Sequence, residues 1–465
     1  MNDEKRSEHL VAIPYPGRGH INPMMNLCKL LVTKYPNLAI TVIVTEEWLS
    51  ILKPTPIPHA MTFKSIPNVI PLAVNRASNF VDFFKAVFTK MEVPVEELLN
   101  ELKEEMPPVL AILADTYLPW AVSMGHRRNT PLVSLWTQSP SVFSMFYHFD
   151  LVIKNGQFPA NLSERGNEIV DYIPGIASTH LAALPAVFSG IGQQILCNAL
   201  DAVSSSTKAQ AIILTTFEEL EPQVTTTLKE ILSVPIYSVG PVIPHTTLDT
   251  TGNDNLEDYF RWLDLQPAES VLYISFGSFL SVSSEQMEEI IQGIRESGVR
   301  YLWVARGDTS QIQEDCGEMG LVVPWCDQLK VLCHPSIGGF WTHCGWNSTL
   351  EGVYAGVPML TCAIAFDQAP NQKLIVEDWK IGMIVKKVAK DILVGRKDIS
   401  KIVQRFMDLD GTESKEMRIN ARVIKERCRQ ALSKGGSSEV NLDAFVSDFC
   451  RGSLSLGMGV FSGGL

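Results

Sequence analysis

Short runs of apolar, mostly β-branched residues alternate along the first half of the chain with stretches whose apolar positions recur every three or four residues. The short runs predict buried strands, and the longer stretches predict amphipathic helices. Regular alternation of the two is typical of parallel βαβ units. We expect strands at 10–14, 39–45, 61–66, 109–115, 132–136, 211–215 and 236–239, and helices at 23–34, 80–91 and 141–153.

A break in this pattern follows the first half. Residues 240–252 are rich in Pro, Thr and Gly, which is typical of a linker between domains. The alternation then restarts, with strands expected at 271–276, 301–305, 321–323, 337–340 and 358–361 and helices at 284–295, 345–354, 370–379, 415–433 and 440–449. The pattern predicts an α/β fold with one domain at 1–240, a linker at 241–254, a second domain at 255–436, a helix at 437–450 that can pack back on the first domain, and a flexible tail at 451–465.

Composition excludes several classes of protein. The 465 residues are too many for one ordinary core, and 46% of them are hydrophobic, enough for two. The formal charge of −12 and the scattered basic residues argue against a nucleic-acid partner, because phosphate binding needs clustered Lys and Arg. The charged start lacks a signal-peptide pattern, and no run of about 18 apolar residues could span a membrane. We therefore expect a cytoplasmic monomer whose nine cysteines, which form no CxxC pair, are reduced.

One segment of the second half suits a phosphate. Residues 338–345 read as a buried strand that runs into a turn, and a helix follows. In open α/β sheets ligands bind at the carboxyl ends of strands, and the free N–H groups of a helix start favour an anion. Asn347 and Ser348 add side-chain donors, and His343 can donate a further bond. Taken alone, His343 would be read as a structural histidine.

Four residues on either side of this segment suit the other parts of a nucleotide sugar. The two carboxylate oxygens of Glu351 match the vicinal hydroxyls of a ribose. Trp325 could stack on a flat base, and Asp367 with Gln368 could hold adjacent sugar hydroxyls. Each also has an ordinary alternative. Glu351 could be a solvated carboxylate, Trp325 a core residue, and Asp367 with Gln368 a helix cap.

The first strand expected in the second domain ends in a Gly-Ser turn. Gly277 lets the backbone approach a ligand, and Ser278 could reach a phosphate, although such turns are common. Neither GxGxxG nor GxxxxGK[ST] occurs, which argues against dinucleotide and ATP sites. No metal motif stands out, and we expect no metal and no cofactor beside a nucleotide-sugar substrate.

The 44 residues from Trp325 to Gln368 resemble the signature box of plant UDP-dependent glycosyltransferases, the family-one enzymes that glycosylate small molecules. Residues 14–23, PYPGRGHINP, also resemble the start of that family. Two positions depart from its pattern. Asp327 replaces a proline or alanine and should change only a turn, while Ala363 replaces a proline and should make the approach to the sugar less rigid. The shared positions are Trp325, Gln328, His334, Gly338, Phe340, residues 343–348, Glu351, residues 356–358, Asp367 and Gln368.

The resemblance implies the GT-B arrangement, in which two Rossmann-like domains face each other across a cleft. The N-terminal domain would bind the acceptor and the C-terminal domain the UDP-sugar. Glutamine at position 368 is typical of members that use glucose, so UDP-glucose is the expected donor. The site residues implied are Trp325 and the backbone of Cys326 for uracil, Gln328 and Glu351 for ribose, Ser278, His343, Asn347 and Ser348 for the diphosphate, and Trp346, Asp367 and Gln368 for the sugar.

A catalytic pair is expected in the N-terminal domain. His20 follows a strand and precedes a helix, and a histidine can take the proton of a hydroxyl near neutral pH. Asp115 ends the strand at 109–115 and could bind the other ring nitrogen, which would fix the tautomer. From spacing alone the two residues could equally cap a helix and a strand. The resemblance assigns them the roles of base and orienting residue, and it implies a single displacement that inverts the anomeric carbon.

Aromatic residues of the first half could line a cavity for a small apolar plant metabolite with a hydroxyl or carboxyl, although most such residues belong to the core. Two other functions stay open. One is a UDP-sugar epimerase on the same architecture, and the other is a non-catalytic protein that binds a UDP-sugar or a small metabolite. The presence of both His20 and Asp115 favours the transferase. The acceptor-pocket residues expected are Phe84, Trp136, Phe143 and Tyr147.

Overall fold

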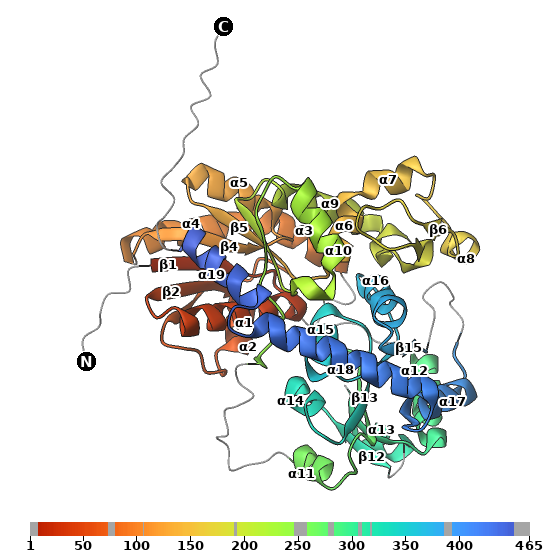
Figure 1. Ribbon diagram of the computed structural model, residues 1–465. Coiled ribbons are helices and arrows are strands. Elements are labelled where there is room, and N and C mark those ends of the chain that lie inside the picture. The colour runs from red at the N-terminus through yellow and green to blue at the C-terminus, as the bar shows by residue number, and fades with distance from the viewer. Residues whose placement is uncertain are drawn as a thin grey trace.

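The chain forms two parallel β-sheets with helices around them (Figure 1). This architecture is seen in a computed structural model that describes residues 8–72, 80–105, 107–189, 193–245, 258–277, 283–305, 309–316, 319–385 and 393–450. The expected α/β class is confirmed. The tail at 451–465 and most of the expected linker lie outside the described residues. None of the described helices is long and apolar enough to cross a membrane.

The first sheet has seven strands in the order β3-β2-β1-β4-β5-β8-β9, and all neighbours are parallel. The strand order reverses between β1 and β4, and the crevice at such a reversal is the usual ligand site of an open α/β sheet. A short antiparallel pair, β6 (Ile169–Val170) and β7 (Thr179–His180), lies apart. The seven strands are β1 (Glu8–Ile13), β2 (Leu38–Thr45), β3 (Met61–Ile66), β4 (Val109–Asp115), β5 (Leu132–Trp136), β8 (Ala211–Leu214) and β9 (Ile236–Ser238).

Local signals fix several helices of this half. Thr45 accepts a bond from the backbone of Trp48 and caps α2, while Ser139 caps α6, which starts with Pro140. Asn129 ends α5 in the left-handed conformation. The helices are α1 (Arg18–Lys34), α2 (Glu46–Leu52), α3 (Phe80–Lys90), α4 (Glu92–Glu105), α5 (Pro119–Arg128), α6 (Pro140–Tyr147), α7 (Phe149–Lys154), α8 (Leu162–Arg165), α9 (Gln193–Ser206) and α10 (Pro222–Ile231), with 3-10 turns η2 (Leu181–Ala183), η3 (Ala186–Phe188) and η5 (Glu218–Leu220).

The second sheet has six parallel strands in the order β12-β11-β10-β13-β14-β15. Its strand order also reverses, between β10 and β13. The strands are β10 (Val271–Ser275), β11 (Arg300–Val304), β12 (Gly320–Val323), β13 (Ile337–Thr342), β14 (Met359–Thr361) and β15 (Gly382–Ile384). The helices are α11 (Asp258–Asp264), α12 (Ser284–Ser297), α13 (Thr309–Cys316), α14 (Gln328–Leu332), α15 (Trp346–Ala355), α16 (Gln368–Lys373), the π-turn η7 (Leu374–Asp378), α17 (Arg396–Met407), α18 (Thr412–Leu432) and α19 (Ser437–Phe449).

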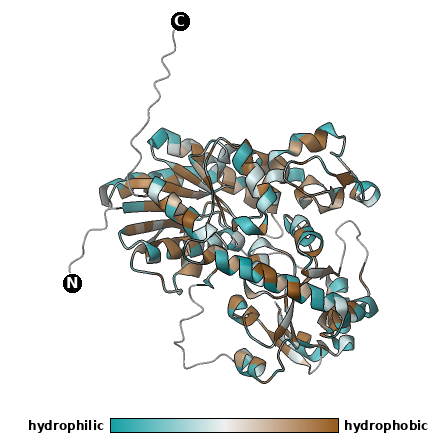
Figure 2. Ribbon diagram, in the orientation of Figure 1, coloured by the Kyte–Doolittle hydropathy of each residue, from teal (hydrophilic) through white to brown (hydrophobic). Residues whose placement is uncertain are grey.

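Each sheet buries both of its faces. Along β1, Val11 and Ile13 belong to one buried cluster, whereas Leu10 and Ala12 belong to another, because successive strand residues point to opposite faces. The second sheet likewise separates two clusters. Figure 2 shows the resulting pattern, with mostly brown strands and with helices that alternate between brown and teal. A strand that is buried on both faces must be apolar at nearly every position, which agrees with the short apolar runs in the sequence.

The last helix returns to the first sheet (Figure 1). Leu442, Phe445 and Phe449 of α19 join the apolar cluster on one face of that sheet. The hydroxyl of Tyr237 donates to Asp448 at 2.5 Å, and Lys34 lies 3.2 Å from Glu439. α19 thus ties the end of the second half to β9 and α1.

Most expected elements agree with the structure to within three residues at each end. Three helices differ more. The one expected at 141–153 is divided at His148 into α6 and α7, and the one expected at 370–379 begins at Gln368 and ends in the π-turn. The helix expected from residue 23 starts at Arg18, because Pro23 is accommodated inside its second turn. The short strands β6, β7 and β15 were not expected.

Candidate active site

His20 lies in the first turn of α1, just beyond the carboxyl end of β1, and not ahead of the helix as expected. Its Nδ1 is 2.8 Å from Oδ2 of Asp115 and 2.9 Å from the hydroxyl of Thr137. Among the described residues, Nε2 has no hydrogen-bond partner. The side chain keeps 20% of its surface exposed, so the imidazole is held through Nδ1 and remains partly accessible.

Asp115 holds this arrangement from the end of β4. Its side chain is fully buried, and Oδ1 accepts a bond from the backbone N–H of Tyr117 at 2.9 Å. One carboxylate oxygen is thus fixed by the main chain while the other faces the imidazole. β1 and β4 are neighbours in the sheet, which is why two residues 95 positions apart meet.

Aromatic rings enclose the imidazole. The ring of Tyr15 lies 4.8 Å from that of His20, and the ring of Tyr117 lies 5.6 Å away, edge to face. Phe84 packs beside both tyrosines. This apolar wall lowers the local polarity around the histidine. Sequence reasoning missed Tyr15, Tyr117 and Thr137, although all three follow the carboxyl end of a strand.

His343 is confined between two glycines across the cleft. A Cβ on Gly277 would lie 2.6 Å from Nε2 of His343, and one on Gly345 would lie 2.5 Å from the same atom. Gly277 also has a φ of +77°, a conformation that favours glycine. The β13–α15 turn passes through Cys344 at φ +67°. The imidazole of His343, the residues that follow β10 and the start of α15 therefore lie close together.

Asn347 connects the two halves directly. Its Nδ2 donates to the carbonyl of Gly19 in α1 at 2.9 Å. This carbonyl is available because Pro23, four residues on, has no N–H to donate to it. Asn347, which is expected to bind a diphosphate, therefore contacts the residue that directly precedes His20 in the opposite half.

Gln328 joins the residues expected to hold a ribose. Its Nε2 donates to Oε2 of Glu351 at 2.5 Å and to the hydroxyl of Ser348 at 2.9 Å, while Tyr273 donates to its carbonyl oxygen. Burial raises the pKa of Glu351 to about 7. The bond from Gln328 opposes that shift because it stabilises the carboxylate. Glu351 is therefore no solvated surface carboxylate.

Trp325 is 64% exposed, so the interpretation as a core indole is wrong. Beside it Cys326 is buried, with its sulfur 3.4 Å from the hydroxyl of Tyr273. The side chain of Asp327 accepts a bond from the backbone of Lys330 at 3.3 Å and caps α14. The departure at Asp327 thus gives the turn a helix cap in place of a proline.

Gln368 has a fixed orientation. Its Oε1 accepts backbone bonds from Ile364 at 2.8 Å and Ala365 at 2.9 Å, so its NH₂ group points away from them and can only donate. The N–H of Ala363, which a proline would lack, donates to Gln372 at 3.2 Å. These bonds shape the loop without the family's proline.

Asp367 lies just before α16 and is bound by a residue of that helix. Its Oδ2 accepts a bond from Asn371 at 2.9 Å and does not cap α16. Burial raises its pKa to about 6, and a positive charge on His20 would lower it. The charge of His20 is therefore close enough to Asp367 to influence the ionisation of its carboxyl group.

The structure does not show the side chains of two of the expected donor residues at the site. The indole of Trp346 is buried and packs near Trp379, so only its main chain can meet a sugar. Ser278 lies outside the described residues. Asn371, which sequence reasoning missed, donates to both Asp367 and the carbonyl of Cys344.

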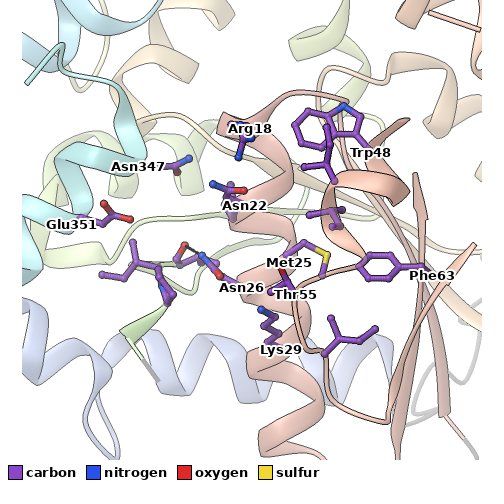
Figure 3. Close-up of a pocket in the computed structure, with 17 residues that line it drawn as sticks. Arg18, Asn22, Met25, Asn26, Lys29, Trp48, Thr55, Phe63, Asn347 and Glu351 are labelled. Carbon is purple, nitrogen blue, oxygen red and sulfur yellow. Dashed lines mark hydrogen bonds between the residues drawn. The ribbon is translucent and has the colours of Figure 1, made fainter. Parts of the chain in front are cut away.

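A cavity of about 250 Å³ adjoins these groups (Figure 3). Asn347 and Glu351 form its wall on the side of α15, and Arg18, Asn22 and Lys29 of α1 line the opposite side. Trp48 and Phe63 supply apolar surface. Within the described residues, no group of three or more His, Cys, Asp or Glu side chains could hold a metal ion.

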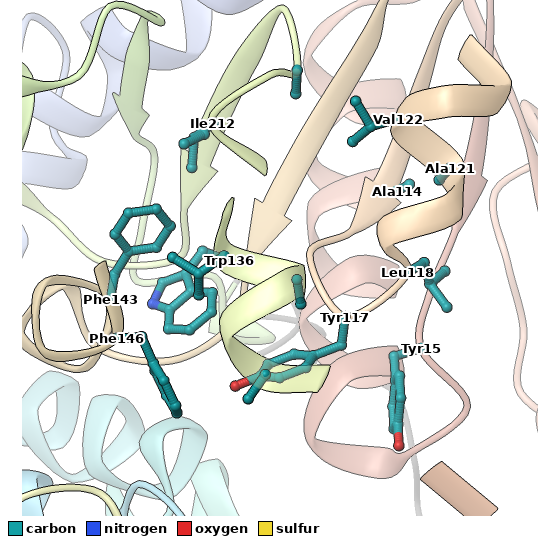
Figure 4. Close-up of a cluster of buried hydrophobic side chains, with 14 of the residues drawn as sticks. Tyr15, Ala114, Tyr117, Leu118, Ala121, Val122, Trp136, Phe143, Phe146 and Ile212 are labelled. Carbon is teal, nitrogen blue, oxygen red and sulfur yellow. The ribbon is translucent and has the colours of Figure 1, made fainter. Parts of the chain in front are cut away.

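The expected acceptor residues belong to one aromatic cluster. Trp136 and Phe143 are fully buried and meet edge to face, and Figure 4 shows them beside Tyr117 and Phe146. The indole of Trp136 donates to the carbonyl of Ser139 at 2.9 Å. These two residues form core structure. Phe84 is buried next to Tyr15, and Tyr147 is 39% exposed.

Known proteins resemble this chain over nearly its full length. Residues 248–399 match the family described as UDP-glucoronosyl and UDP-glucosyl transferase. UDP-glycosyltransferase 87A2 of Arabidopsis thaliana is 50% identical over 440 residues, covering 94% of this chain and 96% of the relative. UDP-glycosyltransferase 87A1 of the same plant is 48% identical over 443 residues, covering 94% of this chain and all of the relative.

Solved structures agree. Medicago truncatula UGT71G1 complexed with UDP-glucose has a TM-score of 0.80 and 27% identity, covering 97% of this chain and 100% of that one. Phytolacca americana UGT2 complexed with UDP-2fluoro-glucose and pterostilbene also has a TM-score of 0.80, with 26% identity. The match covers 95% of this chain and 99% of that one. The fold is therefore the GT-B arrangement. The chain belongs to the plant family-one UDP-glycosyltransferases, enzymes that transfer a sugar from a UDP-sugar.

Proposed function

We propose that this enzyme transfers glucose from UDP-glucose to a hydroxyl or carboxyl of a small apolar plant metabolite, with inversion at the anomeric carbon. The observation that carries the proposal is the bond between His20 and Asp115, which leaves Nε2 of the histidine available to an acceptor. Family membership decides against an epimerase and a non-catalytic binder.

In the proposed mechanism, Nε2 of His20 takes the acceptor's proton as the acceptor oxygen attacks the anomeric carbon. The bond from that carbon to UDP breaks on the opposite face, so α-linked glucose becomes β-linked. Asp115 holds the tautomer that leaves Nε2 unprotonated and stabilises the imidazolium that forms. Charge grows on the leaving diphosphate, where the start of α15 and His343 can stabilise it.

The proposed donor site takes each part of UDP-glucose in turn. The exposed face of Trp325 suits uracil, with the backbone of Cys326 at its edge. Glu351 and Gln328 suit the ribose hydroxyls. Asn347 would exchange its bond with Gly19 for one to the diphosphate, which would couple donor binding to the position of α1. For the diphosphate we also propose Ser278, His343 and Ser348. For the sugar we propose the side chains of Asp367 and Gln368 together with the main chain of Trp346.

We place the acceptor beside Tyr15, Tyr117 and Phe84, because these rings surround the imidazole. An aromatic wall suits a flat or terpenoid alcohol. The complex of Phytolacca americana UGT2 with pterostilbene supports an acceptor of this size and polarity.

The test is UDP release from UDP-glucose with a panel of phenols, flavonoids, terpenols and carboxylic acids, followed by proton NMR of the product. We expect acceptor-dependent release and a β-linked glucoside. An α-linked product would contradict the single displacement. UDP release that is independent of every acceptor would contradict the proposed acceptor class.

A further inference from the structure

The loop that carries Asp367 and Gln368 is fastened to the acceptor half through Phe366. The backbone carbonyl of Phe366 accepts a bond from the N–H of Ala186 at 2.8 Å. Its ring lies 5.1 Å from that of Phe80 and packs against the buried cluster of the first sheet. Phe366 comes from the second half of the chain, so both contacts cross the cleft.

The backbone of Phe366 is held in an uncommon conformation. Its φ is +56°, which is rare for an aromatic residue and persists only where surrounding contacts hold it. The residues on either side are also fixed, because Ala365 donates to Gln368 and Asp367 accepts from Asn371. The cross-cleft contacts of Phe366 and the bonds that hold Ala365 and Asp367 therefore lie on three successive residues.

A continuous path of rings leads from Phe366 to the base. Phe80 packs on Phe84 at 5.8 Å, and Phe84 packs on Tyr15 at 5.9 Å. Tyr15 in turn lies 4.8 Å from His20. A displacement of Phe366 would therefore change both the sugar loop and the wall of the acceptor site.

We infer that Phe366 is a positioning residue that sets the distance between the sugar and the acceptor. The inference rests on the proposed function for the location of the sugar, and it names a residue that neither the resemblance nor the donor roles include. Holding two reactants in register accounts for a large part of catalysis, and a misplacement of about 1 Å can cost roughly 100-fold in rate. When the register is lost, water attacks the anomeric carbon in place of the acceptor and gives its proton to Nε2 of His20. The bond from that carbon to UDP breaks as before, and the products are UDP and free sugar.

Two variants break the two cross-cleft contacts separately. Phe366→Gly removes the ring and tolerates the positive φ. Ala186→Pro removes only the N–H donor. Proline is acceptable there because Ala186 is the first residue of η3 and Pro185 before it is extended, with φ −51° and ψ 133°. The matched control is Phe260→Ala, which removes a half-buried ring packed on Tyr259 within the second half.

The experiment measures glycoside and free sugar formed from whichever UDP-sugar the unmodified enzyme uses best, together with UDP affinity by calorimetry. We expect Phe366→Gly and Ala186→Pro to lower kcat for transfer about tenfold or more and to raise the fraction of free sugar. UDP affinity should change less than about twofold, and Phe366→Tyr and Phe260→Ala should keep the original product ratio. An unchanged ratio of glycoside to free sugar in Phe366→Gly or in Ala186→Pro would overturn the inference. Failure of UDP-glucose as donor would instead affect only the proposed function.

Discussion

His20 and Asp115 meet at 2.8 Å, Nδ1 to Oδ2, at the carboxyl ends of two adjacent strands of the first sheet. The carboxylate is buried and its second oxygen is bound to the main chain. The imidazole is thus held through Nδ1, and its side chain stays 20% exposed.

Asp115→Ala and Asp115→Asn should differ in activity. Alanine leaves the hydroxyl of Thr137 at 2.9 Å from Nδ1, so part of the orientation survives. Asparagine keeps the oxygen that binds Tyr117, but its NH₂ group would donate to Nδ1 and move the ring proton to Nε2. We expect kcat to fall in both, and further in Asp115→Asn. Steady-state kinetics with one acceptor decides this, and a larger loss in Asp115→Ala would show that charge matters more than tautomer.

Gly277→Ala should weaken the donor site by displacing His343. The added Cβ would lie 2.6 Å from Nε2, and we expect KM for the UDP-sugar to rise about tenfold or more. Gly298→Ala is the matched control, since its φ of +65° is equally unfavourable for alanine but nothing lies within 4 Å of the new Cβ. It should lower stability by about 1 kcal/mol and leave KM unchanged. Equal KM in both variants would argue against a donor role for His343.

Glucose should be preferred over galactose by about tenfold or more in kcat/KM, because a buried N–H left without an acceptor costs about 1–3 kcal/mol. Gln368→Glu keeps the oxygen that binds Ile364 and Ala365 but removes the donor, and it should lower this preference. Gln372→Glu, which keeps the bond to Ala363 in the same loop, should not. Competition between the two donors measures the ratio, and equal use by the unmodified enzyme would refute the role of Gln368.

Glu351 should make the unliganded enzyme less stable as pH rises. Its pKa is about 7 in the folded protein and 4.5 in the reference state, so the folded protein binds more protons between these values. Its stabilising contribution is complete below pH 4.5 and is lost as pH rises through 7. Glu351→Gln should therefore gain stability over the unmodified protein between pH 5 and 8, by up to about 3 kcal/mol, less what partial exposure removes. Urea unfolding at several pH values tests this, and a difference that does not vary with pH would contradict it.

The strands and the polar residues that follow them could be predicted from sequence, because a strand buried on both faces must be apolar throughout. β3, β4 and β5 were predicted at their exact ends, and Asp115 was placed correctly at the end of β4. Asp115 could be paired with His20 because parallel strands end at one edge of a sheet.

Contacts across the cleft could not be predicted in this way. The bond from Asn347 to Gly19 and the packing of Phe366 depend on how two domains meet, and no periodic pattern encodes this. The burial of Trp346 and the exposure of Trp325 likewise follow from tertiary packing, since one tryptophan begins a helix and the other lies three residues before one. Pro23 is a local signal for the contact of Asn347 with Gly19, because a proline at this position leaves the carbonyl of Gly19 without its helical N–H donor.

The most direct test of the account is His20→Ala, with acceptor-dependent turnover and UDP-glucose affinity measured on the same protein. We predict that kcat falls roughly 100- to 10,000-fold, as for loss of a general base, while the dissociation constant for UDP-glucose changes less than about twofold. Adding Asp115→Ala to this variant should cause no further loss, because the carboxylate acts through the imidazole. Turnover that survives His20→Ala, or an additive loss in the double variant, would contradict the assignment of His20 as the base.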